Sequence, residues 1–88
     1  MTSDIAVLVD AFDRLAAVGF EVGPEWQAVH AICQNHEGES MYDWGHAFCH
    51  RIEGDDWNAG YWYRRAGKPM ASGSFVHEWA VMRRNISA

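Results

Sequence analysis

Apolar residues recur at helical spacing in five stretches of the chain, and glycine and proline fall almost entirely between those stretches. The first stretch has the i, i+3, i+4, i+7 pattern of an amphipathic helix. Its apolar positions are Ile5, Leu8, Val9, Phe12, Leu15 and Ala16. No segment alternates with a period of two, so no sheet is expected. The sequence therefore predicts an all-α fold: a single domain over residues 1–88, a compact bundle of about five helices.

Capping residues and helix breakers set the expected boundaries. Ser3 and Asp55 suit the N-cap position, and Pro24 suits the first position of a helix. Gly19 and Gly67 are typical of helix ends. The predicted helices cover about residues 4–18, 24–37, 40–53, 56–66 and a last segment beginning after Ser72 or Ser74. We expect the first four to form two hairpins, with the fifth added at the C-terminus.

The composition favours a core built from aromatic rings. Of the 88 residues, 49% are apolar, and they include five Trp, four Phe and three Tyr. Chains this short bury a modest share of their surface, so large rings are expected to dominate the folding energy. Surplus rings on so small a body predict an exposed one, which would point to a partner or a dimer surface.

The charge and the hydropathy pattern disfavour nucleic-acid and membrane partners. Seven basic and twelve acidic residues give a formal charge of −5, which should repel nucleic acid. The basic clusters, residues 64–68 and 83–84, fall at expected helix ends, where cations meet the helix dipole favourably. No basic leader and no apolar run of membrane length occurs. We therefore expect a cytoplasmic protein with reduced cysteines and neither nucleic-acid nor membrane partners.

Residues 50–67 carry the most distinctive string. It contains a Gly54-Asp55 turn, then Ala59, Tyr63 and Ala66 at spacings of five, four and three from the glycine onward. This resembles the second half of a tetratricopeptide unit, in which the glycine makes the turn and the small residues allow close helix packing. The resemblance implies a helical hairpin over residues 40–67.

The fuller string, His-Arg-x-Glu-Gly-Asp-x-x-Asn-Ala-x-Tyr-Trp-Tyr-Arg-Arg-Ala-Gly, is also similar to one found in a family of small proteins. That likeness covers about residues 26–86 and implies no particular activity. Gly45 and Gly60 are the two glycines inside predicted helices. Because glycine weakens a helix, such positions usually indicate close approach of a neighbouring helix.

The predicted helix at 40–53 has a polar stripe beside its apolar one. The stripe holds Tyr42, His46, Cys49, His50 and Glu53. One hypothesis is a pocket in which a histidine acts as general base and Glu53 orients it, so that His46, His50 and Glu53 are the candidate catalytic residues. The alternative, which we favour, is that the histidines bond neighbouring polar groups and Cys49 packs in the core.

A second pattern has the chemistry of a zinc site. Cys33, His36, His46 and Cys49 read as Cys-x2-His-x9-His-x2-Cys, with two closely spaced pairs of competent ligands. The four atoms converge only if two helices cross at the right height. We therefore favour no metal and no cofactor, and keep these four as the candidate ligands.

The predicted helix at 56–66 has aromatic residues on most of its surface. If Ala59, Tyr63 and Ala66 face the preceding helix, a second face remains; its residues are Trp57, Tyr61, Arg64 and Arg65. Trp, Tyr and Arg are enriched at interface hot spots. The alternative is that these rings pack against the predicted helix at 24–37 or the last helix, because a small domain needs every ring in its core. The leading hypothesis is a non-catalytic module that binds a protein or peptide through this face, or forms a homodimer. The alternative is a small metal-binding protein or enzyme that uses the polar stripe at 40–53.

Overall fold

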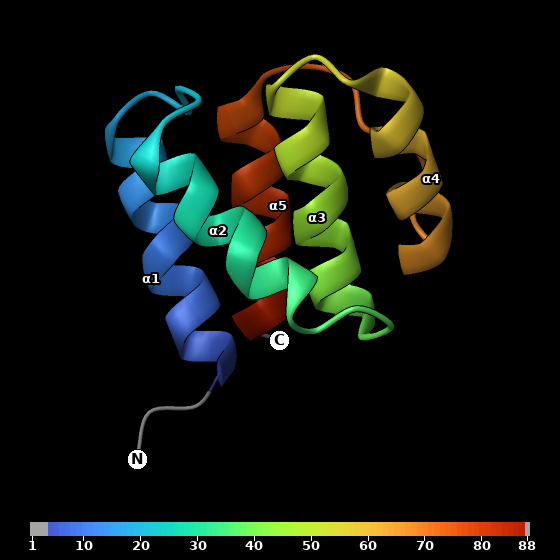
Figure 1. Cartoon of the computed structure of the whole chain (residues 1–88), viewed down its shortest axis with the longest axis horizontal. Coiled ribbons are helices and arrows are strands. Elements are labelled where there is room, and N and C mark those ends of the chain that lie inside the picture. The colour runs from blue at the N-terminus through green and yellow to red at the C-terminus, as the bar shows by residue number, and fades with distance from the viewer. Residues whose placement is uncertain (1–3, 88) are drawn as a thin grey trace.

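Five helices make up the computed structural model, which describes residues 4–87, and this range contains no strand (Figure 1). The prediction of an all-α bundle is confirmed. The helices are α1 (Asp4–Ala17), α2 (Pro24–Gln34), α3 (Ser40–Ile52), α4 (Asp56–Ala66) and α5 (Phe75–Ser87). Every helix within 4–87 is too short or too polar to cross a membrane.

The helix boundaries follow the local signals closely at α4. Asp55 is the N-cap, and its carboxylate accepts a hydrogen bond from the backbone N–H of Asn58. Gly67 ends the helix in the left-handed conformation, with a φ of 72°. The expected cap of α1, Ser3, lies outside the described residues.

The predicted end of α2 was wrong. The helix ends at Gln34 rather than near residue 37. The backbone then turns, with the N–H of His36 bonded to the carbonyl of Cys33. Gly38 follows with a φ of 94°, a left-handed backbone conformation that a right-handed helix cannot continue through.

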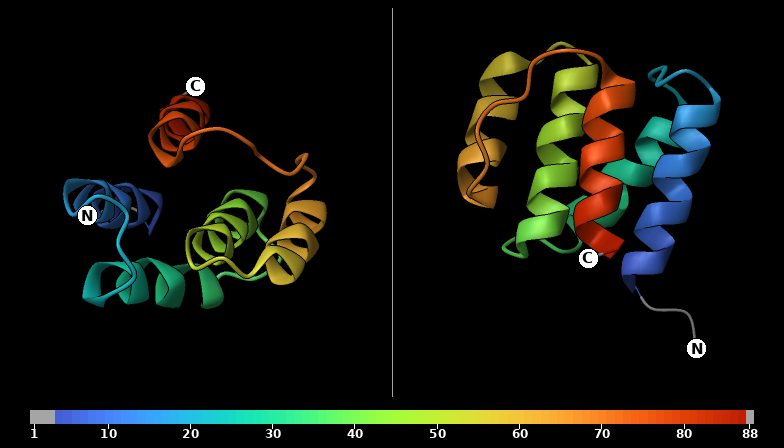
Figure 2. Two further views of the ribbon diagram at one scale, coloured as in Figure 1. Left: turned by 90° about the horizontal axis from the view of Figure 1, so that it is seen from above. Right: turned by 180° about the vertical axis from the view of Figure 1, so that it is seen from behind.

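The helices surround α3. Figure 1 shows α3 and α4 beside one another, with α2 crossing in front from α1 to α3. Figure 2 shows α5 on the side opposite to α2, between α1 and α3. Consecutive helices pack in pairs from α1 to α4, and α5 returns to α1. Eight consecutive residues of α3, 42–49, are buried as a result.

The core is held by aromatic contacts between distant helices. Phe12 of α1 stacks on Phe48 of α3 and on Trp79 of α5, with ring centroids 5.5 and 4.6 Å apart. All three rings are buried. Trp79 also donates a hydrogen bond from Nε1 to Asp13, so α5 is fixed to α1 by both packing and a polar contact.

A buried carboxylate joins α5 to α3 and α4. Glu78 is 4% exposed and accepts hydrogen bonds from Trp44 Nε1 at 3.2 Å and Arg51 Nη1 at 2.9 Å. It also accepts a short hydrogen bond from the hydroxyl of Tyr63, and burial together with this bond raises the pKa of Tyr63. A buried charge needs such partners, since desolvation without them is expensive.

Gly45 lies where side chains of other helices pack tightly against α3. A Cβ built at this position would lie 2.7 Å from Sγ of Cys33 and 3.2 Å from the ring of Phe12. At Gly60, by contrast, the nearest atom would be the flexible guanidinium of Arg64, at 3.5 Å. Only the first of the two helical glycines is therefore required by packing.

We predict opposite effects of alanine at these two glycines. Gly60→Ala should raise the free energy of unfolding by about 0.5–1 kcal/mol, because alanine is the better helix former. Gly45→Ala gains the same propensity but must displace buried atoms, which costs about 1–3 kcal/mol, so its net effect should be destabilising. Urea denaturation of both variants measures this, and a Gly45→Ala protein more stable than wild type would contradict the packing argument.

Removing the buried carboxylate should be far more damaging. Glu78→Leu leaves the largely buried Arg51 guanidinium with only the Gly73 carbonyl as a partner, and it removes the acceptor of Trp44 and Tyr63, so we expect a loss of about 3–5 kcal/mol in the free energy of unfolding. Glu78→Gln retains an acceptor for Trp44 and Tyr63 and should lose less. Equal unfolding midpoints for Glu78→Leu and wild type would contradict the role assigned to this residue.

Candidate functional site

Three histidines from two helices meet on the side of α3 that faces α2. His30 comes from α2, whereas His46 and His50 lie one turn apart on α3. One ring nitrogen from each histidine lies within 4.8 Å of the other two. We refer to His30, His46 and His50 as the histidine cluster.

Ring contacts hold the cluster in place. His30 is edge-on to His46 and to His50, with centroids 4.7 and 5.3 Å apart, and the latter two rings stack at 5.0 Å. Trp26 stacks on His30 at 5.0 Å, and Trp62 of α4 stacks on His46 at 4.0 Å. The cluster is therefore enclosed between two indole rings.

A backbone contact fixes the height of α2 against α3. Trp26 donates from Nε1 to the carbonyl oxygen of Cys49, at 2.8 Å. Because Trp26 and His30 are one helical turn apart, this bond also sets the position of His30 beside His46. The indole thus serves both as a stacking partner and as an anchor.

His46 is the most enclosed member of the cluster. Its side chain is buried, with the residue 3% exposed, and its Nδ1 has no hydrogen-bond partner. An unsatisfied buried polar atom costs about 1–3 kcal/mol and calls for an explanation. Burial, reinforced by His30 and His50, lowers the pKa of His46 to about 4, so the ring is neutral at pH 7.

The other two histidines are half-buried and differently partnered. Burial and the proximity of His50 lower the pKa of His30, against a smaller opposing effect of Glu53. His50 Nδ1 lies 2.6 Å from the Glu53 carboxylate. Because a carboxylate only accepts hydrogen bonds, Nδ1 carries the proton in this pair, and the lone pair of neutral His50 is on Nε2.

The sequence-predicted zinc ligands do not form one group. Among residues 4–87, the sets of three or more histidine, cysteine or carboxylate side chains whose ligand atoms converge within 4.8 Å are the histidine cluster and His50–Glu53–Asp55. Cys33 and Cys49 are fully buried, and burial raises the pKa of both thiols, so neither is a ready thiolate. His36 stacks on Tyr42, away from the cluster.

The predicted catalytic residues are partly assembled. His46, His50 and Glu53 are neighbours, and His50 and Glu53 are bonded as the stripe on α3 suggested. Sequence reasoning missed His30, which completes the group from another helix. The signal that was present is the four-residue spacing of His46 and His50, which presents two imidazoles on one helix face.

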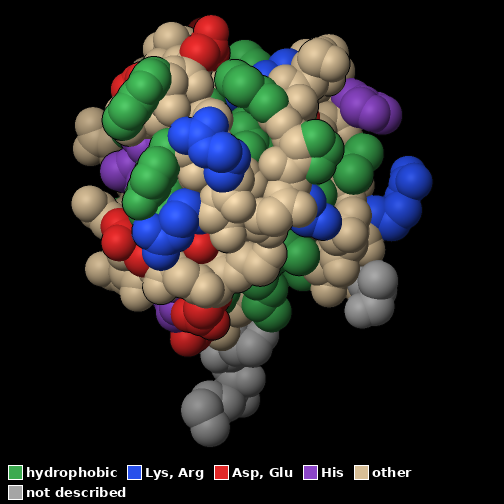
Figure 3. Space-filling view, turned by 90° about the vertical axis from the view of Figure 1, so that its right-hand side faces the viewer, with side chains coloured by type: hydrophobic (Ala, Val, Ile, Leu, Met, Phe, Trp, Pro, Cys, Tyr) green, Lys and Arg blue, Asp and Glu red, His purple; other side chains and the backbone are tan. Residues whose placement is uncertain are grey.

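The second predicted site lies on the solvent side of α4. Ala59, Tyr63 and Ala66 are buried, whereas Trp57 is 77% exposed and Tyr61 37%. We call Trp57, Tyr61, Arg64 and Arg65 the α4 outer face. On this side of the molecule, Lys and Arg side chains lie among hydrophobic ones (Figure 3).

Within the α4 outer face, the side chain of Arg65 is held in place by contacts with two aromatic residues. It donates to the hydroxyl of Tyr61 at 3.0 Å, and its guanidinium lies 5.2 Å from the centre of the Trp62 ring. The hydrogen bond from Arg65 is the main reason that its pKa is raised. Trp57 and Arg64 remain exposed.

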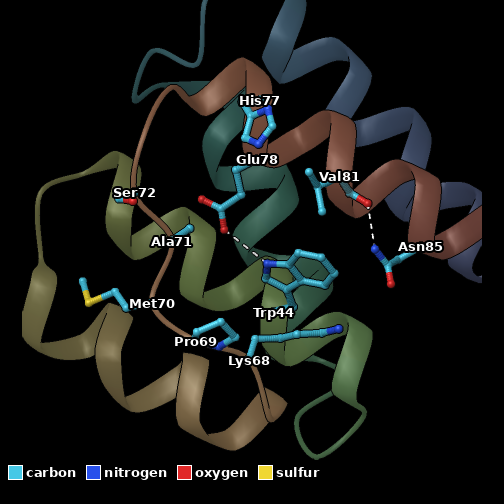
Figure 4. Close-up of a pocket in the computed structure, with 10 residues that line it drawn as sticks. All are labelled: Trp44, Lys68, Pro69, Met70, Ala71, Ser72, His77, Glu78, Val81 and Asn85. Atoms are coloured by element: carbon cyan, nitrogen blue, oxygen red, sulfur yellow. Dashed lines mark hydrogen bonds between the residues drawn. The ribbon is translucent and has the colours of Figure 1, made fainter.

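A hollow of about 280 Å³ lies between α5, α3 and the segment that joins α4 to α5 (Figure 4). Trp44 forms one wall, with Nζ of Lys68 4.6 Å from its ring centre. Glu78 points at the indole and bonds it, so its carboxylate is already occupied by partners within the fold. The hollow therefore offers mainly apolar surface, from residues such as Met70 and Val81.

Comparisons with protein-family models, with curated proteins and with solved structures give no match to this chain. The function of the two sites therefore has to be argued from their own chemistry.

We predict that the cluster makes the fold sensitive to acid. The unfolded chain protonates His46 near pH 6.5, whereas the folded chain does so only near pH 4. Between these values the unfolded state holds more protons, so the free energy of unfolding falls by about 2–3 kcal/mol as the pH drops from 6.5 to 4. The lowered pKa of His30 adds to this loss.

His46→Phe is the matched variant, because phenylalanine retains a ring against Trp62 and does not titrate. Its stability should fall less than that of wild type between pH 6.5 and 4, as measured by urea denaturation across the pH range. Parallel curves for the two proteins would show that His46 is not the titrating group.

Proposed function

We propose that this protein is a non-catalytic interaction module that binds an acidic segment of a partner protein through the α4 outer face. The observation that carries the proposal is the exposure of Trp57, at 77%, in a domain of only 88 residues. A small domain gains most from burying its rings, so a solvent-facing indole has no folding role to explain it.

The composition of the face supports binding rather than chance exposure. Trp57, Tyr61, Arg64 and Arg65 fall on one side of α4 at helical spacing. Asp56, the acidic residue within α4, lies on another side of the helix. Indole, phenol and guanidinium groups dominate hot spots because they combine apolar area with directional polar contacts.

The charge of the face supports an acidic partner. The chain has a formal charge of −5, yet this surface presents two guanidinium groups beside its aromatic rings. Complementary charge accelerates encounter and discriminates against wrong partners. The recognised segment should therefore carry carboxylates together with an apolar side chain that covers Trp57.

The same charge disfavours self-association through this face. In a twofold dimer the same patch meets itself, so Arg64 and Arg65 of one copy would approach those of the other. Like charges across an interface cost binding energy. A partner protein is therefore the better occupant than a second copy.

The test uses a displayed library of random linear peptides selected on the full chain. We expect selected peptides to be rich in Asp, Glu and large apolar residues. Trp57→Ala should weaken their binding at least tenfold, since truncating a hot spot costs about 2 kcal/mol or more. Arg64→Glu should slow association and reduce its dependence on salt.

Matched controls come from α5. Val76, 68% exposed, and Arg84, also exposed, lie outside the face, so Val76→Ala and Arg84→Glu should bind as wild type does. Unfolding midpoints of Trp57→Ala and wild type should agree closely, because the indole is exposed. Selection of no peptide that depends on Trp57 would refute the proposal, as would a dimer, seen by sedimentation, that dissociates in Trp57→Ala.

A further inference from the structure

We propose that His30, His46 and His50 form a binding site for a late first-row divalent metal ion such as Zn²⁺. The site lies between α2 and α3 and is separate from the α4 outer face. Imidazole nitrogen is a preferred ligand of Zn²⁺, Cu²⁺, Ni²⁺ and Co²⁺, and three such ligands exclude Mg²⁺ and Ca²⁺, which require oxygen.

The positions of the nitrogens are close to those of a metal site. A tetrahedral ion about 2.0–2.1 Å from each nitrogen holds the nitrogens about 3.4 Å apart. The three nitrogens of the cluster already lie within 4.8 Å of one another. To hold the ion, the nitrogens therefore have to approach one another by about 1.4 Å at most, from 4.8 Å to about 3.4 Å.

The unpartnered nitrogen of His46 is a second, independent observation. His46 is 97% buried, and its Nδ1 makes no hydrogen bond. A histidine used only for packing would be expected to satisfy this atom with a carbonyl, hydroxyl or carboxylate. An Nδ1 whose lone pair is kept for a metal ion has a reason to leave the hydrogen bond unmade.

The protonation states suit a metal ligand. A metal ion competes with protons for the imidazole lone pair, so a ligand that is already neutral binds more tightly at pH 7. Burial lowers the pKa values of His30 and His46, which keeps both rings neutral. The third ring, that of His50, is instead oriented by its hydrogen bond to the Glu53 carboxylate.

Glu53 supports His50 as outer-shell carboxylates support metal-bound histidines. Its carboxylate bonds Nδ1 at 2.6 Å, which orients the ring and leaves the Nε2 lone pair of His50 for the ion. Trp26 and Trp62 stack on the other two rings and limit their rotation. Three protein ligands leave a further coordination position for water.

The alternative is an aromatic cluster with no ion, in which the three imidazoles only fill space between two indoles. Both accounts predict that the rings pack together. They differ in whether the nitrogen atoms matter, so the decisive variant removes the nitrogens and keeps a ring.

The test is titration of the full, untagged chain, freed of metal by a chelator, with Zn²⁺ in a calorimeter and with Co²⁺ in a visible spectrometer. We expect one equivalent to bind, with a Kd of about 10 µM or tighter. Bound Co²⁺ should give the visible absorption of a nitrogen-ligated ion. Zn²⁺ should also raise the unfolding temperature in a concentration-dependent manner.

The variants separate ligands from bystanders. His30→Ala and His46→Phe should each weaken Zn²⁺ binding at least tenfold. His46→Phe keeps a ring against Trp62, so it removes the nitrogens with little change in packing even if His30→Ala disturbs the fold. Glu53→Gln should weaken binding less than ligand removal does, since its role is to orient His50. His77→Ala, at an exposed histidine of α5, is the matched control and should bind as wild type does.

The proposal is overturned if the metal-free wild type binds neither Zn²⁺ nor Co²⁺. It is also overturned if His46→Phe binds as tightly as wild type, or if His77→Ala abolishes binding. Trp57→Ala should leave Zn²⁺ binding unchanged, so failure of the metal site and failure of peptide binding are distinguishable.

Discussion

The carboxylate of Glu78 fixes how α3 is turned about its own axis. It accepts hydrogen bonds from Trp44 and Arg51, which are two helical turns apart and therefore share a face of α3. That face is held against α5. His46 follows Trp44 by two residues, about 200° further round the helix, so it faces away from α5 and toward α2. The histidine cluster thus depends on a carboxylate that none of its members contacts.

The path of α5 also explains why one face of α4 is left to solvent. After α4 the chain crosses the bundle and places α5 against α1 and α3, where Trp79 stacks on Phe12. In an extended array of helical hairpins, the next helix would continue alongside α4. Here α5 instead packs against α1, and the outer residues of α4, such as Trp57 and Arg64, are exposed. Trp57 is exposed because α5 does not cover this side of α4, and its ring can therefore contact a partner.

Local sequence signals were sufficient to predict where the helices lie, but they were insufficient to predict the histidine cluster. Gly and Pro between apolar runs, and the cap at Asp55, located α4 to the residue, because caps and breakers act within one turn. The polar stripe on α3 brought His46, His50 and Glu53 into consideration by spacing alone. His30 was missed because its place beside them depends on how α2 crosses α3. That crossing rests on long-range contacts, the hydrogen bond from Trp26 to the Cys49 carbonyl and the packing of Cys33 against Gly45. The same contact buries Cys33 as a core thiol, and the early end of α2 turns His36 away.

The two candidate sites are joined by a single ring. Trp62 stacks on His46 at 4.0 Å and meets Tyr61 edge-on at 5.1 Å, while the guanidinium of Arg65 lies 5.2 Å from its centre. Closing the cluster around an ion would move the His46 ring against this indole. Binding at one site affects the other only if the two ligands favour different positions of Trp62. Because Trp62 is 9% exposed and packed on both sides, it has little room to move, so we expect the two sites to act independently.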